Sequence, residues 1–225
     1  MEERFKDYET ETLEIELSGT LFKLVRVTNT DALYAALVAK GEGHEDVKDE
    51  RIPYWADLWP SAVALAGEVM EHPAIHAGIH VLEIGCGLGL PGIAAGKRGA
   101  SVLLTDYMED PLIFARLNWK KNLVSEPVTA LLDWRKPEGF APYDVLLASD
   151  VAYERRAFEY LIQAFKHLIK PDGLILLSEP RRMVALPFLE KLPDLGFEVK
   201  VSGRVIPLNG RKNEVNVYEI RQKSI

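Results

Sequence analysis

The segment VLEIGCGLGLPG, residues 81–92, places a run of glycines directly after a short apolar stretch. Glycine lets the chain turn tightly and lets the backbone approach a ligand closely, because no side chain stands in the way. A strand that ends in such a loop and continues into a helix is typical of doubly wound α/β folds. The segment therefore predicts a parallel sheet with a ligand at the carboxyl end of the strand that precedes Gly85.

Two kinds of cofactor-binding loop fit this segment. Gly87, Gly89 and Gly92 match the G-x-G-x-x-G pattern of dinucleotide-binding proteins, which is a weak signal when it stands alone. The alternative is acid-x-Gly-x-Gly-x-Gly, in which Glu83 stands two residues before Gly85. The predicted strand ends three residues before Gly87, and the chain has no room for a second substrate domain after residue 150. Both observations favour the acid–glycine pattern.

Strands and helices are expected to alternate on both sides of this loop. Apolar runs without alternation, such as residues 145–148, are typical of strands buried on both faces of a parallel sheet. We predict an α/β fold with a doubly wound, mostly parallel seven-stranded sheet. The expected strands are 79–84, 102–105, 128–132, 145–148, 174–177, 197–201 and 215–220, the expected helices begin at residues 60, 111 and 155, and residues 171–173 are expected to turn.

The N-terminal part of the chain has a different pattern. Apolar and acidic residues alternate over 13–17, Ser18-Gly19 supplies a turn, and residues 21–27 return, which predicts a β-hairpin. A short helix through Lys40 and a charged loop over 41–52 are expected to follow. We predict an acidic hairpin and helix extension over residues 1–50 and a catalytic domain over residues 51–225.

Composition restricts the class of protein. The 225 residues are 48% hydrophobic and 27% charged, with a net charge of −7, and residues 1–60 hold 14 acidic but only 7 basic side chains. A net-acidic chain is a poor default binder of nucleic acid. The single cysteine excludes an internal disulfide, and the first residues lack the apolar segment of a signal peptide. We therefore expect a cytoplasmic protein with neither a nucleic-acid nor a membrane partner.

Two polar positions follow the next strands of the predicted sheet. Asp106 ends the second strand, where a carboxylate can accept hydrogen bonds from both hydroxyls of a ribose. Asp133 and Trp134 follow the third strand, where an indole offers a flat face to an adenine and a carboxylate can accept from its amino group. The structural alternatives are a turn acid at Asp106 and a core indole at Trp134.

No metal site is expected. His72, His76 and His80 have the spacing of one helix face, but Pro73 and Gly78 interrupt it, and no acidic or cysteine partner completes a site in sequence. We expect surface histidines instead. Arg181 and Arg182 follow the fifth strand, where they could neutralise an acidic substrate or remain a solvated pair.

Four motifs in a fixed order carry a family resemblance. Trp59-Pro60 begins a helix, the glycine motif follows, then Asp133-Trp134, and then Asp150-Val151-Ala152-Tyr153 after the fourth strand. Together they resemble the seven-β-strand protein lysine methyltransferases of methyltransferase family 16, within the class I S-adenosylmethionine-dependent enzymes. The resemblance covers about residues 50–180, and Asp-x-x-Tyr is its most specific element.

The resemblance implies a cofactor, a site and a reaction. It implies S-adenosylmethionine as the cofactor, no metal, and Asp150 and Tyr153 as the catalytic residues that face a protein lysine. Ser149 and Cys86 depart from the residues common in the family, yet both side chains are small. Small-molecule N-methylation of the nicotinamide type, nucleic-acid methylation and NAD(P)-dependent oxidoreduction stay open as alternatives. The expected cofactor-binding residues are Trp59, Glu83, Gly85, Cys86, Gly87, Asp106, Tyr107, Asp133, Trp134 and Ser149.

Overall fold

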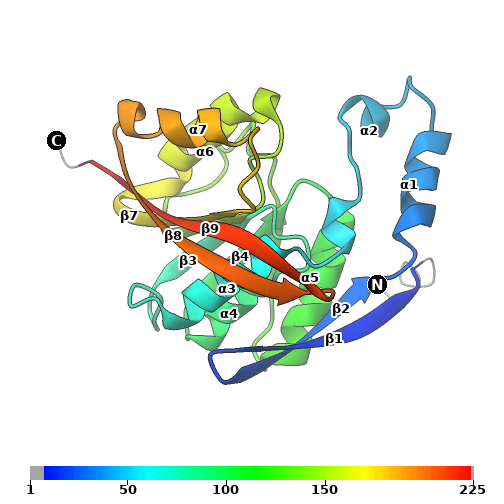
Figure 1. Ribbon diagram of the computed structural model, residues 1–225, viewed down its shortest axis with the longest axis horizontal. Coiled ribbons are helices and arrows are strands. Elements are labelled where there is room, and N and C mark those ends of the chain that lie inside the picture. Colours follow the sequence, from blue (N-terminus) through cyan, green and yellow to red (C-terminus); the bar gives the residue numbers. More distant parts are fainter. Residues whose placement is uncertain (1–7, 224–225) are drawn as a thin grey trace.

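A seven-stranded sheet in the order β5-β4-β3-β6-β7-β9-β8 forms the centre of the computed structural model, which describes residues 8–223 (Figure 1). Strands β3 to β7 all run parallel to one another, whereas β9 runs antiparallel to both β7 and β8. The predicted mostly parallel sheet is confirmed. Its strands are β3 (His80–Ile84), β4 (Ser101–Asp106), β5 (Val128–Leu131), β6 (Tyr143–Ser149), β7 (Ile169–Glu179), β8 (Phe197–Leu208) and β9 (Arg211–Gln222).

Helices cover both faces of the sheet, because alternate residues of its central strands are apolar on both sides. Val81 and Val145 contribute to the core beneath one set of helices, whereas their chain neighbours Leu82 and Leu146 contribute to the core on the other face. The first face is covered by α3 (Pro60–Glu71), α4 (Leu90–Lys97) and α5 (Glu109–Asn122), and the second by α6 (Phe158–Leu168) and α7 (Leu186–Lys191). No helix within residues 8–223 is both long and apolar enough to cross a membrane.

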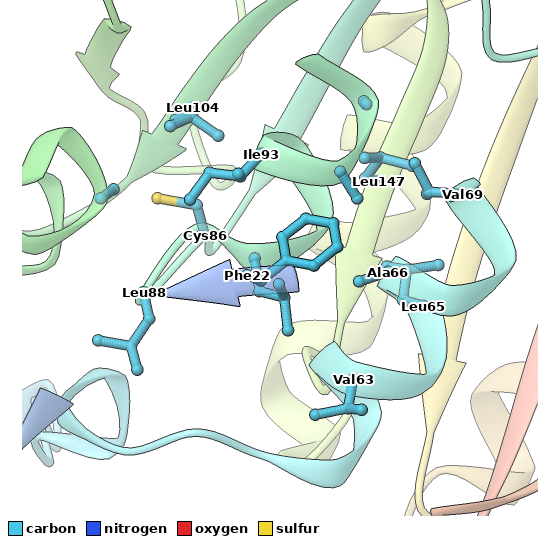
Figure 2. Close-up of a cluster of buried hydrophobic side chains, with 14 of the residues drawn as sticks. Phe22, Val63, Leu65, Ala66, Val69, Cys86, Leu88, Ile93, Leu104 and Leu147 are labelled. Atoms are coloured by element: carbon cyan, nitrogen blue, oxygen red, sulfur yellow. The ribbon is translucent and has the colours of Figure 1, made fainter. Parts of the chain in front are cut away.

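The predicted N-terminal hairpin forms from β1 (Thr10–Leu17) and β2 (Thr20–Val27), and it packs against the helical layer. Phe22 is fully buried among side chains of α3 and α4 (Figure 2). Two amides on α5 satisfy the outer backbone of β2: Asn118 accepts from the Val25 N–H at 2.7 Å, and Asn122 accepts from the Lys23 N–H at 3.0 Å. Asn118 also donates to the carbonyl of Leu88, which ties the hairpin to the glycine loop.

The segment between the hairpin and the sheet is an exposed arm. Helix α1 (Thr30–Ala39) has no buried residue, and the short helix α2 (Glu45–Lys48) lies inside the stretch expected to be a charged loop. Figure 1 shows α1 and α2 standing away from the sheet. Acidic residues of this arm pair across to later segments, since Arg135 contacts Asp49 at 3.4 Å and Arg156 contacts Glu50 at 3.1 Å.

Strand boundaries differ from the expectation in two places. The turn expected at residues 171–173 is wrong, because Ile169 already pairs with Tyr143 and the register shifts before Leu174 pairs with Val145. This irregularity lets the chain stay in β7 while it passes a turn-forming sequence. Strands β8 and β9 are also longer than expected, at 12 residues each, because they form a hairpin that extends beyond β7.

The strand order of the sheet reverses at β3, so β3 lies at the topological switch point. Both β4 and β6 lie beside β3, and the chain reaches them by crossovers on opposite faces. In open α/β sheets a ligand binds outside the carboxyl ends of the strands at such a point. The glycine loop after β3, Asp106 at the end of β4 and Asp150 after β6 all lie there.

Candidate active site

A cavity of about 550 Å³ lies at the carboxyl ends of β3, β4 and β6. This volume is within the range of small-molecule sites. Ten of the twelve predicted site residues line it, whereas Glu83 and Asp133 do not. The ten are Trp59, Gly85, Cys86, Gly87, Asp106, Tyr107, Trp134, Ser149, Asp150 and Tyr153.

The glycine loop has the backbone conformation that requires glycine. Gly85 and Gly87 have φ angles of 60° and 50°, in the left-handed region that other residues adopt only with strain. A side chain at Gly85 would also come within 3.2 Å of the Trp134 ring. The loop therefore keeps its backbone open to the cavity and in contact with the indole at the cavity wall.

Asp106 presents a buried carboxylate to the cavity. Its side chain accepts from the N–H groups of Gly87 at 3.2 Å and Met108 at 3.3 Å, and the residue is only 5% exposed. Burial raises the pKa of this carboxyl to about 6, against the lowering effect of those backbone donors. A carboxylate can accept about four hydrogen bonds, so two further donors can be accommodated. This is the acceptor capacity that a ribose diol requires.

Glu83 lies behind the loop instead of in the cavity. It is fully buried, its Oε2 accepts from the Gly92 N–H at 2.9 Å, and its Oε1 has no partner. A side chain at Gly92 would overlap Leu104 and approach this carboxylate. Glu83 therefore fixes the start of α4 beneath the loop. The structure gives no support to its expected direct contact with a cofactor.

Burial makes Glu83 a pH-dependent element of stability. Desolvation is the main cause that raises its pKa from 4.5 to about 8, and the nearby Asp106 adds to the effect. The folded protein then keeps a proton that the unfolded chain releases above pH 4.5. The free energy of unfolding should therefore fall as the pH rises from 4.5 towards 8, by at most ~1.4 kcal/mol per pH unit.

Glu83→Gln should remove this pH dependence, because glutamine keeps a carbonyl oxygen for the Gly92 N–H and cannot ionise. We expect the variant to gain stability relative to the wild type between pH 5 and 8. Urea unfolding of both proteins at several pH values measures the difference, in which all other titrating groups cancel. Parallel pH profiles for the two proteins would contradict a protonated Glu83.

The Asp133-Trp134 pair is split between two roles. Trp134 lines the cavity beside Gly85, whereas the Asp133 carboxylate accepts from the Arg135 side chain at 2.8 and 2.9 Å. This partner, together with the Arg135 backbone N–H, holds the pKa of Asp133 below its usual value despite its partial burial. Trp134 is thus available to an adenine face, and Asp133 is already occupied by a guanidinium.

Aromatic rings surround the part of the cavity that Asp150 faces. Tyr54 packs edge-on against Tyr153, with ring centroids 5.8 Å apart, and against Trp59, at 6.0 Å. Trp59 also donates its indole N–H to the carbonyl of Tyr54 at 2.7 Å. Burial raises the pKa of Tyr153 above its usual value, so its phenol stays protonated at neutral pH. Tyr54, Trp59 and Tyr153 thus form an aromatic wall beside the carboxylate of Asp150.

Asp150 is held in a strained conformation at the end of β6. Its φ angle is 59°, and its backbone N–H donates to the carbonyl of Ser178 at 2.9 Å. Its carboxylate is only 11% exposed and pairs with both terminal nitrogens of Arg182. A non-glycine residue with positive φ at such a position is a common feature of functional sites.

Several cavity residues were not predicted from the sequence. Tyr54 and Trp55 stand in the same aromatic segment as Trp59, which is the signal that could have indicated them. Met108 follows Asp106 by two residues. Arg182 was noted only as part of a pair, and its position opposite Asp150 had no local signal. The unpredicted lining residues include Tyr54, Trp55, Leu58, Met108, Glu154 and Arg182.

The packing of Cys86 determines how its thiol can behave. Cys86 is 5% exposed, and burial, with the nearby carboxylates of Asp106 and Glu83, raises the pKa of its thiol well above its usual value. It therefore packs as a small side chain and is a poor nucleophile.

His72 corrects the expectation of surface histidines. It is 7% exposed, and two carboxylates, Glu68 and Glu219, lie close enough to form a three-residue group with it. The expectation that no acidic partner exists is wrong at this position. However, its Nδ1 accepts from the Ala74 N–H at 3.1 Å, so Nε2 carries the proton and faces Glu219. Glu68 pairs with Arg204. Contacts within the protein thus account for Glu68 and His72, and none of the three residues lines the cavity.

Comparison with known proteins gives a family match. The family model described as lysine methyltransferase matches residues 48–194. Among curated proteins, Protein N-lysine methyltransferase METTL21A of Xenopus tropicalis is 35% identical over 56% of this chain and 61% of its own length. Histone-arginine methyltransferase METTL23 of Xenopus laevis is 39% identical over 52% of this chain and 53% of its own length. The chain thus spans little more than half of these relatives.

Solved structures share the fold at low sequence identity. A TehB-like SAM-dependent methyltransferase from Corynebacterium glutamicum aligns with a TM-score of 0.56 and 17% identity, over 87% of this chain and 97% of that one. Precorrin-6y C5,15-methyltransferase from Geobacter metallireducens aligns with a TM-score of 0.56 and 18% identity, over 72% and 87%. At these identities the similarity concerns the Rossmann-like fold alone.

Proposed function

Because the chain belongs to the lysine methyltransferase family, we propose that it transfers a methyl group from S-adenosylmethionine to the ε-amine of a protein lysine. The observation that carries this proposal is a single cavity lined by Asp106 at the end of β4 and by Asp150 and Tyr153 after β6, with β3 between these two strands. The first carboxylate suits a ribose, and the second suits a cationic acceptor. The division at residue 50 and a cytoplasmic location stay predictions.

The cavity residues fit this cofactor. Asp106 has unused acceptor capacity for two hydroxyl donors, and Trp134 offers an indole face beside the loop backbone. When bound, the cofactor supplies an electrophilic methyl group on a sulfonium. The protein's part is to hold donor and acceptor at attack distance and in line. We propose Trp59, Gly85, Cys86, Gly87, Asp106, Tyr107, Trp134 and Ser149 as its contacts, and no metal.

The acceptor side must present a neutral amine. A lysine has a reference pKa of about 10.4, so deprotonation at pH 7.4 costs roughly 4 kcal/mol. A wall formed by Tyr54, Trp59 and Tyr153 lowers that cost, because it desolvates the ammonium. Asp150 holds the arriving ammonium by charge, the ammonium then loses its proton to solvent, and the neutral Tyr153 phenol orients the resulting amine by a hydrogen bond that leaves the nitrogen lone pair free.

An arginine acceptor is the second candidate. One matched relative carries the name histone-arginine methyltransferase. In addition, Asp150 already pairs with both terminal nitrogens of a guanidinium, that of Arg182. The family match makes the oxidoreductase alternative unnecessary. The lack of a proline after Asp150 does not fit the methylation of a nucleobase. Small-molecule N-methylation remains an outcome of the test.

The experiment is to incubate the protein with radiolabelled S-adenosylmethionine and a host lysate, with EDTA present, and to locate the label by mass spectrometry. We expect label on protein lysine. Label on protein arginine would favour the second candidate. Label found only in RNA or small molecules would overturn a protein acceptor, and loss of activity with EDTA, restored by a divalent ion, would reveal a metal requirement. Asp106→Asn serves as the matched variant without cofactor binding.

A further inference from the structure

Arg182 occupies the acceptor side of the cavity. Its guanidinium lines the cavity and pairs with the Asp150 carboxylate through both terminal nitrogens, with Nη2 3.2 Å from Oδ2. The Arg182 side chain is 33% exposed, whereas that of Asp150 is 11% exposed. The carboxylate that would bind an acceptor cation is thus already neutralised by a cation of the same chain.

A second carboxylate lies behind the first. Glu179 is 1% exposed, and its two oxygens accept from the backbone N–H of Arg182 at 3.0 and 2.9 Å. The nearest distance from its Oε1 to the Arg182 Nη1 is 3.8 Å, so the charges attract without a hydrogen bond. A small rotation of the side chain would bring the guanidinium from Asp150 onto Glu179.

The charges of this group are unbalanced by one. Asp150 and Glu179 provide two carboxyl groups, and Arg182 supplies a single positive charge. Burial raises the pKa of Glu179, whereas the backbone N–H and the charge of Arg182 act in the opposite direction. The other titratable cavity groups nearby are the phenols of Tyr54 and Tyr153 and the acid Glu154, which add no cation. Buried charges are stable when paired. One additional cation would complete the balance, with Asp150 and Glu179 each holding one.

We propose that Arg182 determines acceptor specificity by competing with the acceptor cation for Asp150, and that it transfers to Glu179 when that cation binds. This inference rests on the proposed function for the identity of the acceptor side. A neutral acceptor could not displace the guanidinium, because Asp150 would then lose its counter-ion. The pair therefore selects for cationic side chains and closes the site to neutral ones.

The test uses n-butylammonium, which has the charge and length of a lysine side chain, as the probe. NMR titration of the wild-type protein with S-adenosylhomocysteine bound gives its dissociation constant. Arg182→Gln should bind the probe about tenfold more tightly, since it removes the competitor. Glu179→Gln should bind it more weakly, because the displaced guanidinium has no second carboxylate. Arg181→Gln is the matched control, since Arg181 pairs on the outer side with Glu214 and Asn216.

A double-mutant cycle separates competition from simple structural support. In the Arg182→Gln background, Glu179→Gln should no longer weaken probe binding, because no displaced guanidinium remains for Glu179 to bind. Equal weakening in both backgrounds would mean that Glu179 only supports the fold. Probe binding to Arg182→Gln that is unchanged, weaker or undetectable would overturn the proposal. Melting temperatures of all four proteins establish that each variant is folded.

These outcomes are independent of the acceptor assignment. If S-adenosylhomocysteine fails to bind, or the label in the lysate lies only in RNA or small molecules, the proposed function fails. The probe titration, repeated without S-adenosylhomocysteine, still reports whether Arg182 competes for Asp150. Conversely, lysine labelling combined with unchanged probe affinity in Arg182→Gln would retain the function and reject the competition.

Discussion

Replacement of Asp106 by Ala should weaken binding of S-adenosylhomocysteine by roughly 30- to 1,000-fold. The carboxylate is 5% exposed and keeps acceptor capacity towards the cavity after its two backbone hydrogen bonds. Two charge-assisted hydrogen bonds to a ribose are worth on the order of 2–4 kcal/mol in total. Calorimetric titration of the wild type and the variant measures the loss.

The pH dependence of this binding gives a second readout of the same group. Burial places the pKa of Asp106 at about 6, and a ribose diol donates to the ionised form. Affinity should therefore be constant above pH 7 and fall below pH 6, by at most about tenfold per pH unit. Asp106→Asn should bind weakly at every pH. Absence of binding by the wild type, together with micromolar binding of NAD, would contradict the methyltransferase assignment.

The parts of the site that could be predicted are those fixed by local chemistry. Gly85 and Gly87 have positive φ angles directly after a buried strand, and that combination is visible in the sequence as glycines after an apolar run. Asp106 ends β4 and Asp150 follows β6, the two parallel strands that flank β3, so sheet topology alone brings them to one edge. Strand endings and glycine positions were therefore sufficient to place the glycine loop and both carboxylates at the cavity.

The parts that could not be predicted depend on pairings between distant segments. Asn118 and Asn122 bond to the backbone of β2 nearly 100 residues earlier, and neither stands out on an otherwise ordinary helix. Arg182 lies opposite Asp150, and Glu219 lies beside His72, only after the sheet has formed. Glu83 and Asp133 illustrate the converse. Each has the right residue type for cofactor binding, but Glu83 is buried behind the loop against Gly92, and Asp133 pairs with Arg135, so neither lines the cavity.

The predicted ends of β7, β8 and β9 were wrong for a related reason. Pro171-Asp172-Gly173 is a strong local turn signal, yet these residues form an irregularity within β7, between the pairs Ile169–Tyr143 and Leu174–Val145. The extended β8–β9 hairpin continues beyond the sheet core because its two strands bond to each other along 12 residues. Local propensity is a weak predictor where long-range hydrogen bonds decide the conformation.

Replacement of Asp150 by Asn should lower turnover of a protein acceptor by roughly 100-fold or more, with cofactor affinity within a fewfold of the wild type. The variant keeps the shape of the side chain, so it removes the charge and spares the backbone hydrogen bond to Ser178. Asp150 and Asp106 both line the cavity, and we propose that Asp150 contacts the acceptor and Asp106 the cofactor. A loss of turnover in Asp150→Asn with unchanged cofactor affinity is therefore the result expected if the Asp150 carboxylate binds the acceptor.

Variants of Tyr153 distinguish a cationic acceptor from a heteroaromatic one. The ring of Tyr153 packs edge-on against Tyr54, so Tyr153→Phe keeps this wall and should cost less turnover than Tyr153→Ala. For a lysine or arginine, the loss in Asp150→Asn should exceed the loss in Tyr153→Ala, because charge holds the acceptor. A neutral heteroaromatic acceptor would depend on ring contact more than on the carboxylate and would reverse this order. Measurement of kcat and of S-adenosylhomocysteine affinity for the three variants decides between the two, and the reversed order would exclude a cationic acceptor at Asp150.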